Sequence, residues 1–267
     1  MNLSANLEKY IKSALIAERK LKETQIHVIP AENLLNTPDK LNRETMNIKL
    51  KSTIKNIINS ENSLLIKIIF FSLLCFGILT TLIIFNIQQI NYFDNALVIN
   101  FNHFALKHSS DSMIFITNLG SVMWVLPVAF LLIIGFLKLK RFREAFFLFM
   151  ITGGAGFLTV TLKWLIGRSR PAINYQLTHA YWYGFPSGHT TLATCFYGAL
   201  IYLAYVYIKD KWLKTFVLIF LSILILLIGI SRVYLGVHFL TDVLAGFSIG
   251  IFWTAFCVLI YKKCRNL

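Results

Sequence analysis

Six long apolar runs constrain the fold of this chain more than any other feature. They cover about residues 64–85, 113–137, 145–166, 189–208, 214–231 and 239–261. A bilayer core needs about 20 consecutive apolar residues per helix, whereas the strands of membrane barrels are shorter and alternate in polarity. The hydrophobic share of 57% is also higher than a soluble domain of this length needs. We therefore predict an all-α bundle of six transmembrane helices.

The basic residues between these runs predict how the bundle is oriented. Basic residues gather after the second, fourth and sixth runs, and they precede the first. They are Lys138, Lys140, Arg141 and Arg143, then Lys209, Lys211 and Lys214, then Lys262, Lys263 and Arg265. Cytoplasmic loops of membrane proteins carry an excess of Lys and Arg, so these loops and both termini are expected in the cytoplasm.

The first part of the chain differs from the rest in composition. Residues 1–62 are mixed polar, and we predict that they form an N-terminal cytoplasmic extension, with the membrane domain at 63–267. The formal net charge of +14 fits cytoplasmic loops and contact with anionic lipid, so we do not predict nucleic-acid binding. The four cysteines show neither a disulfide framework nor metal-ligand spacing.

Three short polar clusters interrupt the apolar sequence where runs meet loops. They are Lys163–Pro171 (KWLIGRSRP), Pro186–His189 (PSGH) and Ser231–Asp242 (SRVYLGVHFLTD). With the predicted orientation, the first cluster and Ser231–Arg232 end runs that lead outward. The second cluster and His238–Asp242 begin runs that lead inward. All three clusters should therefore meet on the extracytoplasmic face, a convergence that unrelated polar residues would not need to show.

The residue types in these clusters suit the binding and transfer of phosphate. Arginine offers paired donors that match phosphate oxygens, and lysine adds a point charge. A helix that begins at Ser187 presents unpaired N–H groups to an anion, and Gly188 allows close approach. His238 and Asp242 are four residues apart and share one helix face, so the carboxylate can orient the imidazole.

Each cluster also has a structural interpretation. The cations of the first cluster could be interface anchors whose side chains extend toward water. The second cluster could be a simple helix cap with a satisfied histidine, and His238 with Asp242 could be a structural pair. The joint occurrence of all three clusters favours the functional interpretation.

The order of the motifs resembles the full signature of the type 2 phosphatidic acid phosphatase superfamily. The matching motifs are Lys-x6-Arg-Pro, Pro-Ser-Gly-His and Ser-Arg-x5-His-x3-Asp. The resemblance covers roughly residues 63–261 and implies the six-helix membrane form of a lipid phosphatase. It implies no metal or other cofactor, and the chain shows no carboxylate cluster for magnesium.

The resemblance assigns roles to eight residues. His238 would be the nucleophile that forms a phosphohistidine, Asp242 would orient it, and His189 would protonate the leaving oxygen and then activate water. Five residues would hold the phosphoryl oxygens: Lys163, Arg170, Ser187, Gly188 and Arg232. Arg168 lies inside the first motif but not at a signature position, so the resemblance assigns it no role.

The expected function is hydrolysis of a membrane lipid phosphate at the outer face of a bacterial inner membrane. Phosphatidic acid, phosphatidylglycerophosphate and undecaprenyl diphosphate all carry a suitable head group. A phosphotransferase acting toward an acceptor such as lipid A would use the same residues. A non-catalytic transporter or scaffold is a further alternative, although it would not need both histidines and the carboxylate.

Overall fold

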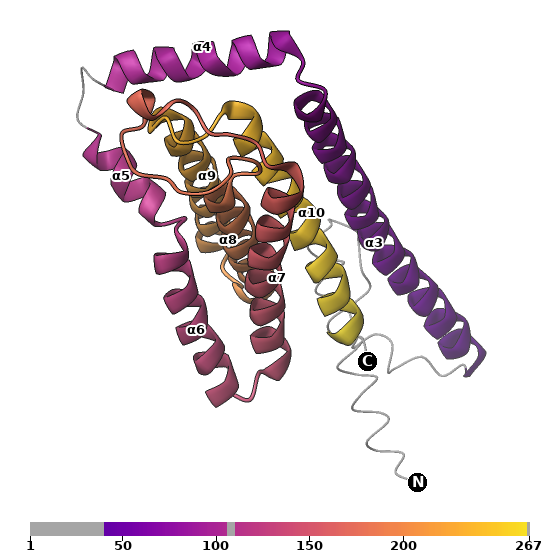
Figure 1. Ribbon diagram of the computed structural model, residues 1–267. Coiled ribbons are helices and arrows are strands. Elements are labelled where there is room, and N and C mark those ends of the chain that lie inside the picture. The colour runs from indigo at the N-terminus through magenta and orange to yellow at the C-terminus, as the bar shows by residue number, and fades with distance from the viewer. Residues whose placement is uncertain (1–39, 106–109, 266–267) are drawn as a thin grey trace. The chain divides into compact units, whose positions relative to one another are not determined.

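The computed structural model describes the backbone of residues 40–105 and 110–265, and this part of the chain contains helices and no strand (Figure 1). The elements follow in this order: α3 (Lys40–Ile84), α4 (Gln88–Ala105), α5 (Asp111–Asn118), α6 (Val122–Lys138), α7 (Phe142–Ile166), the short 3-10 helix η1 (Ile173–Tyr175), α8 (Gly188–Tyr207), α9 (Lys211–Tyr234) and α10 (Leu240–Arg265). The predicted all-α class is confirmed.

Five helices are long and apolar enough to cross a membrane, and α5 with α6 form a bent pair that makes a sixth candidate span. The five are Ser60–Ile84 within α3, then α7, α8, α9 and residues Leu240–Cys264 of α10. Each predicted apolar run therefore corresponds to a candidate span. The second run differs from the prediction because it is broken rather than continuous.

The break in the second span lies between Asn118 and Val122, where the two helices meet at 41°. Ser121 has extended backbone angles and accepts the N–H of Trp124 at 3.3 Å, which is the geometry of a helix N-cap. Gly120 is required here, because a Cβ atom would lie 2.5 Å from Ile228 of α9. The break thus brings α5 against α9.

Helix α4 carries an apolar stripe of Phe93, Leu97, Phe101 and Phe104, which predicts an interfacial helix. Phe93 and Phe104 are exposed, which fits a stripe that faces lipid. The buried residues are Asp94, Val98, Asn102 and Ala105, and the helix packs against α9 and α10. An ionisable side chain therefore points into the protein while aromatic side chains remain outside, as suits a helix beside lipid.

Helix α8 lies among α7, α9 and α10 and is the most deeply buried candidate span. The Gly246 and Gly250 pair of α10 faces α8, because added Cβ atoms would lie 2.9 Å from Ser187 O and 2.6 Å from Thr194 Cβ. Small residues four apart allow such close helix packing. Of the three glycines in α7, only Gly154 packs closely, against Trp253.

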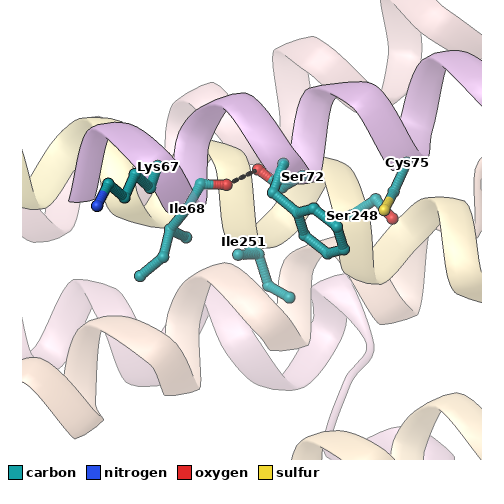
Figure 2. Close-up of a pocket in the computed structure, with 7 residues that line it drawn as sticks. Lys67, Ile68, Ser72, Cys75, Ser248 and Ile251 are labelled. Carbon is teal, nitrogen blue, oxygen red and sulfur yellow. Dashed lines mark hydrogen bonds between the residues drawn. The ribbon is translucent and has the colours of Figure 1, made fainter. Parts of the chain in front are cut away.

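Residues Met1–Leu64 and Leu65–Leu267 form separate units. The predicted boundary after residue 62 stays a prediction, and residues 1–39 of that extension lie outside the described residues. Within the second unit, α3 and α10 line an apolar groove of about 320 Å³ (Figure 2). Its two serine side chains are satisfied by their own helices, since Ser72 donates to Ile68 O at 2.7 Å and Ser248 to Leu244 O at 2.9 Å.

Candidate active site

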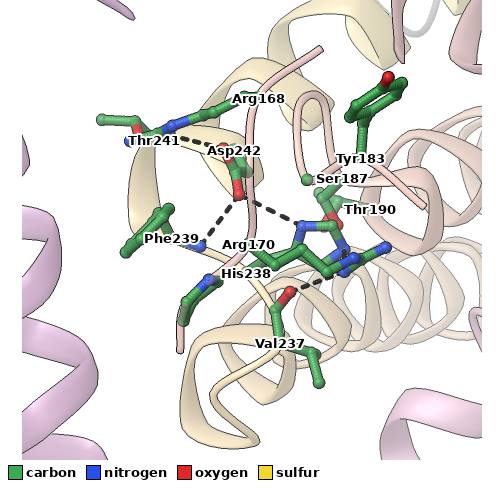
Figure 3. Close-up of polar contacts among 12 residues, drawn as sticks. Arg168, Arg170, Tyr183, Ser187, Thr190, Val237, His238, Phe239, Thr241 and Asp242 are labelled. Carbon is green, nitrogen blue, oxygen red and sulfur yellow. Dashed lines mark hydrogen bonds and ion pairs between the residues drawn. The ribbon is translucent and has the colours of Figure 1, made fainter. Parts of the chain in front are cut away.

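The three polar clusters meet at one end of the bundle, as the sequence predicts. The first occupies the end of α7 and the loop that follows, the second begins α8, and the third joins the end of α9 to the start of α10 (Figures 1 and 3). Direct contacts join them: Arg170 reaches His238, and the Ser187 N–H donates to Asp242 O at 3.0 Å. The predicted site residues therefore form one constellation.

His238 is held at both ring nitrogens. Its Nδ1 lies 3.3 Å from Asp242 Oδ2, and its Nε2 lies 3.1 Å from a terminal nitrogen of Arg170 (Figure 3). A guanidinium donates but never accepts hydrogen bonds, so Nε2 must be the unprotonated nitrogen. The proton then resides on Nδ1 and is donated to the carboxylate. This tautomer leaves a lone pair on Nε2, which is the arrangement that a nucleophilic or basic histidine needs.

The surroundings keep His238 neutral. It lies in the loop between α9 and α10, is almost fully buried, and has Arg170, Arg232 and Lys163 nearby. Burial first, and then these three cations, hold the pKa of His238 well below its ordinary value. A neutral imidazole is therefore the resting state of this residue at neutral pH.

The loop that carries His238 depends on one glycine. Gly236 has a positive φ of 66°, a region that side chains with a Cβ rarely adopt, and an added Cβ would lie 2.0 Å from Tyr175 O. The Leu177 N–H also donates to Leu235 O at 3.0 Å. The segment before His238 is thereby fixed against the loop that follows η1.

Arg170 is positioned by backbone carbonyls. It donates to Trp182 O at 2.8 Å, Val237 O at 2.7 Å and Tyr181 O at 2.9 Å. Burial lowers the pKa of Arg170, and nearby Asp242 partly opposes this effect. The aromatic residues Tyr181, Trp182 and Tyr183 are of the type that gathers at membrane interfaces. Their side chains are exposed, while their carbonyls serve the site, a role that residue type cannot reveal.

Lys163 and the start of α8 line the same region. The buried Lys163 ammonium donates to Tyr183 O and, at 3.4 Å, to Gly184 O, and no described carboxylate pairs with it. Ser187 caps no backbone N–H with its side chain; instead its Oγ accepts a hydrogen bond from Thr190 at 3.0 Å. A Cβ at Gly188 would lie 3.2 Å from Thr159 and 3.9 Å from Lys163. The helix N-terminus and the lysine are thus neighbours.

Arg232 and His189 have unused hydrogen-bonding capacity. Arg232 is buried and donates to Thr117 of α5 at 2.6 Å, but its Nε has no hydrogen-bond partner among the described residues. The His189 side chain is half-buried and makes no hydrogen bond to another described residue. Arg170, Arg232 and His238 are nevertheless close enough to influence it electrostatically. Unpaired buried donors are costly, so they suggest a place for an anionic ligand.

Sequence reasoning missed the partners of Asp242 on its other side. Arg168 donates to Asp242 Oδ1 at 2.6 Å and to Asp94 Oδ2 at 2.8 Å, and its guanidinium lies 4.5 Å from the centre of the Phe239 ring. The rarity of carboxylates after residue 62 was the one available signal that Asp94 has a partner. Among the described residues, no group of three or more His, Cys, Asp or Glu side chains could hold a metal ion.

This chain is similar in sequence to known proteins. Residues 144–266 match the PAP2 superfamily. Phosphatidylglycerophosphatase B of Bacillus subtilis is 36% identical over 138 residues, which are 51% of this chain and 67% of that protein. Lipid A 1-phosphatase of Rhizobium etli is 27% identical over 175 residues, covering 57% and 71% of the two chains.

A solved structure is also similar. The transmembrane PAP2-type phosphatidylglycerolphosphate phosphatase from Bacillus subtilis superposes with a TM-score of 0.65 at 30% identity. The match covers 74% of this chain and 96% of that one. It therefore extends beyond the segment matched by the family model and includes most of the helical bundle.

Proposed function

Because this chain belongs to the PAP2 superfamily, a family with membrane lipid phosphatases among its members, we propose that it hydrolyses a lipid phosphate through a phosphohistidine on His238. The observation that carries the proposal is the tautomer of His238, which its two ring contacts fix. Its Nδ1 faces Asp242 and its Nε2 lone pair faces the cationic side of the cluster. A nucleophile needs such a fixed tautomer with one unprotonated nitrogen.

In the first step, the Nε2 lone pair attacks phosphorus and the bond from phosphorus to the lipid oxygen breaks. The leaving oxygen takes its proton from His189. Arg170 now occupies Nε2 at 3.1 Å, so its contact with the imidazole has to be exchanged for a contact with a phosphoryl oxygen. Asp242 stabilises the positive charge that develops on the ring.

In the second step, water attacks the phosphohistidine and gives its proton to His189. The bond from phosphorus to Nε2 breaks, its electron pair returns to the imidazole, and inorganic phosphate leaves. His189 thus serves as acid and then as base, which restores the enzyme without an outside proton carrier. Its lack of a hydrogen bond to other described residues supports this use.

The charge of the cluster supports a phosphate ligand. Lys163, Arg168, Arg170 and Arg232 contribute four positive charges, while Asp94 and Asp242 contribute two negative charges. The surplus of two matches a phosphomonoester, which carries about −1.5 to −2 at pH 7. Lys163, Arg170, Arg232, Ser187 and Gly188 would hold its oxygens. With this many fixed cations, the reaction proceeds without a metal ion.

Phosphatidylglycerophosphate is the first substrate to test, because the Bacillus subtilis relative is a phosphatidylglycerophosphatase. Phosphatidic acid and undecaprenyl diphosphate follow, since they present the same terminal phosphoryl group. The phosphate would enter the cluster while the acyl or prenyl tail stays in the bilayer. The site would face the extracytoplasmic side of a bacterial inner membrane, with both termini in the cytoplasm, and the basic connections at the other end of the spans support this orientation.

The test is phosphate release by the detergent-purified protein in EDTA with each of the three lipids. We expect release by the wild type, loss of at least about a thousandfold in His238→Ala, and unchanged release in His103→Ala. His103 is an exposed histidine of α4 and controls for the loss of an imidazole. Release that survives in His238→Ala contradicts the nucleophile. Release that appears only with an acceptor lipid indicates a phosphotransferase.

A further inference from the structure

Helix α4 contributes a buried carboxylate to the candidate site from outside the matched segment 144–266. Asp94 is fully buried, whereas its neighbours Tyr92, Phe93 and Asn95 are exposed. A carboxylate removed from water on the flank of an amphipathic helix is costly unless it is paired. The burial of Asp94 therefore requires partners that offset the desolvation of its charge.

Both carboxylate oxygens of Asp94 are used. Oδ1 accepts the backbone N–H of Thr241 at 3.2 Å, and Oδ2 accepts the Thr241 hydroxyl and a terminal nitrogen of Arg168 at 2.8 Å. Thr241 immediately precedes Asp242 at the start of α10. Asp94 thus holds both the backbone beside Asp242 and the guanidinium that binds it.

The guanidinium of Arg168 bridges two buried carboxylates. One terminal nitrogen binds Asp94. The other binds Asp242 Oδ1 and the Thr241 hydroxyl, each at 2.6 Å, and Figure 3 shows Arg168 beside these two residues. The second oxygen of Asp242 is then left for the Phe239 N–H at 3.0 Å and for His238. The relay runs from Asp94 through Arg168 to Asp242 and ends at the imidazole.

We propose that Asp94 is a positioning residue for the phosphatase reaction, acting through Arg168 to fix the Asp242 carboxylate toward His238. This inference rests on the proposed function of the same site. Without Asp94, the guanidinium has only one carboxylate to bind and can rotate to take both oxygens of Asp242. His238 then loses the acceptor that fixes its tautomer, whereas the phosphate-binding residues are untouched.

The first test is the kinetics of Asp94→Asn, which keeps the shape and removes the charge. We expect kcat to fall about 10- to 100-fold, the range seen when a residue supporting a functional side chain is lost, with KM within about twofold. Glu144→Gln is the matched control, because it removes a buried carboxylate of the same membrane domain at the opposite end of the bundle. Its kcat should stay within about twofold of the wild type.

A double-mutant cycle separates positioning from general stability. If Asp94 acts through Arg168, then adding Asp94→Asn to Arg168→Gln should cost little beyond Arg168→Gln alone. Additive losses, or a wild-type kcat in Asp94→Asn, would overturn the inference. If Asp94→Asn does not yield folded protein, Asp94→Glu keeps the charge but shifts it, and it should lose part of kcat with KM kept; a wild-type kcat there also overturns it.

The same measurements distinguish this inference from the proposed function. An active wild type with an equally active Asp94→Asn removes only the role of Asp94. A wild type that releases no phosphate from any of the three lipids counts against the phosphatase itself, and the role of Asp94 falls with it.

Discussion

The two ends of the helical bundle both bury polar side chains, yet they use them differently. At the candidate site, α7, α8 and α10 contribute Lys163, His189 and Asp242. At the opposite end, the same three helices contribute Glu144, Tyr207 and Tyr261. There the Tyr207 hydroxyl donates to Glu144, and the Tyr261 hydroxyl lies 3.1 Å from Glu144 and 3.0 Å from Tyr207.

The two ends differ in net charge and in whether their polar atoms all have hydrogen-bond partners. The Glu144 cluster has one carboxylate, satisfied by two hydroxyls, and the Arg141 guanidinium lies 4.9 Å from the centre of the Tyr207 ring. The candidate site has a surplus of cations, an Arg232 Nε without a partner and a His189 ring without a hydrogen bond to described residues. A complete network fixes the helix ends, whereas an incomplete and charged one is prepared for a ligand.

The largest effect should come from the carboxylate of the site. In Asp242→Asn the side chain keeps its size but presents an amide to His238, so the imidazole can adopt the wrong tautomer. We expect kcat to fall about 10³- to 10⁴-fold, as for the equivalent change in a His–Asp pair. Asp210→Asn is the control, because Asp210 caps α9 at the other end and asparagine caps equally well. A fall below tenfold would contradict the orienting role.

Arg232 should come next. Arg232→Gln removes a buried cation that has no carboxylate partner among the described residues, so the transition-state charge loses one fixed donor. We expect kcat/KM to fall about 10²- to 10³-fold, measured on the best lipid substrate. Lys209→Gln removes an exposed cation from the α8–α9 connection and should leave kcat/KM unchanged. Equal effects of the two changes would mean that only overall charge matters.

The pH dependence should reveal the buried state of His238. The imidazole attacks only when neutral, and its pKa lies well below the ordinary value of about 6.5. The acid limb of kcat/KM that belongs to His238 should therefore lie below pH 6.5. An acid limb of kcat/KM at pH 6.5 that no variant of another residue removes would belong to His238. It would show an unperturbed imidazole and contradict the effect of the cationic surroundings.

The same pKa predicts a pH dependence of stability. Below about pH 6.5 the unfolded chain binds a proton at His238 that the folded protein does not bind. The free energy of unfolding should thus be unaffected by His238 above this pH and should fall as the pH drops below it. Denaturation of wild type and His238→Ala across pH 5 to 8 checks the sign, because the variant lacks this dependence.

The smallest effect on activity should come from the Glu144 cluster. Glu144→Gln disturbs a buried acceptor of two tyrosine hydroxyls, so we expect a loss of stability of about 1–3 kcal/mol with kcat nearly unchanged. A thermal unfolding midpoint and phosphate release, measured on the same preparation, check both parts. A loss of turnover without a loss of stability would show that the two ends are coupled.

Sequence alone predicted the elements whose signals are local. The length of apolar runs identified the spans, and the spacing of His238 and Asp242 identified their pairing. The convergence of the three clusters followed from the alternation of basic loops. The break after Asn118 was missed because apolar residues continue on both sides of it, and the N-cap geometry of Ser121 defines it.

The supporting contacts of the site could not be predicted because they join distant segments. Asp94 lies 74 positions before Arg168 and 147 before Thr241, and Thr117 lies 115 before Arg232. No periodicity connects such pairs. Hydrogen bonds accepted by backbone carbonyls, such as those that Tyr181 and Trp182 accept from Arg170, leave no trace in residue type at all, since every residue has a carbonyl.

The central claim is that phosphate passes through His238, and trapping the intermediate tests it most directly. Purified protein would be mixed with lipid labelled with ³²P on its terminal phosphate, quenched in alkali within milliseconds, and digested to locate the label. The account predicts an acid-labile, alkali-stable label on the peptide that contains His238, present in His103→Ala and absent in His238→Ala. A label on another residue, or phosphate release with no label in a rapid time course, would contradict it.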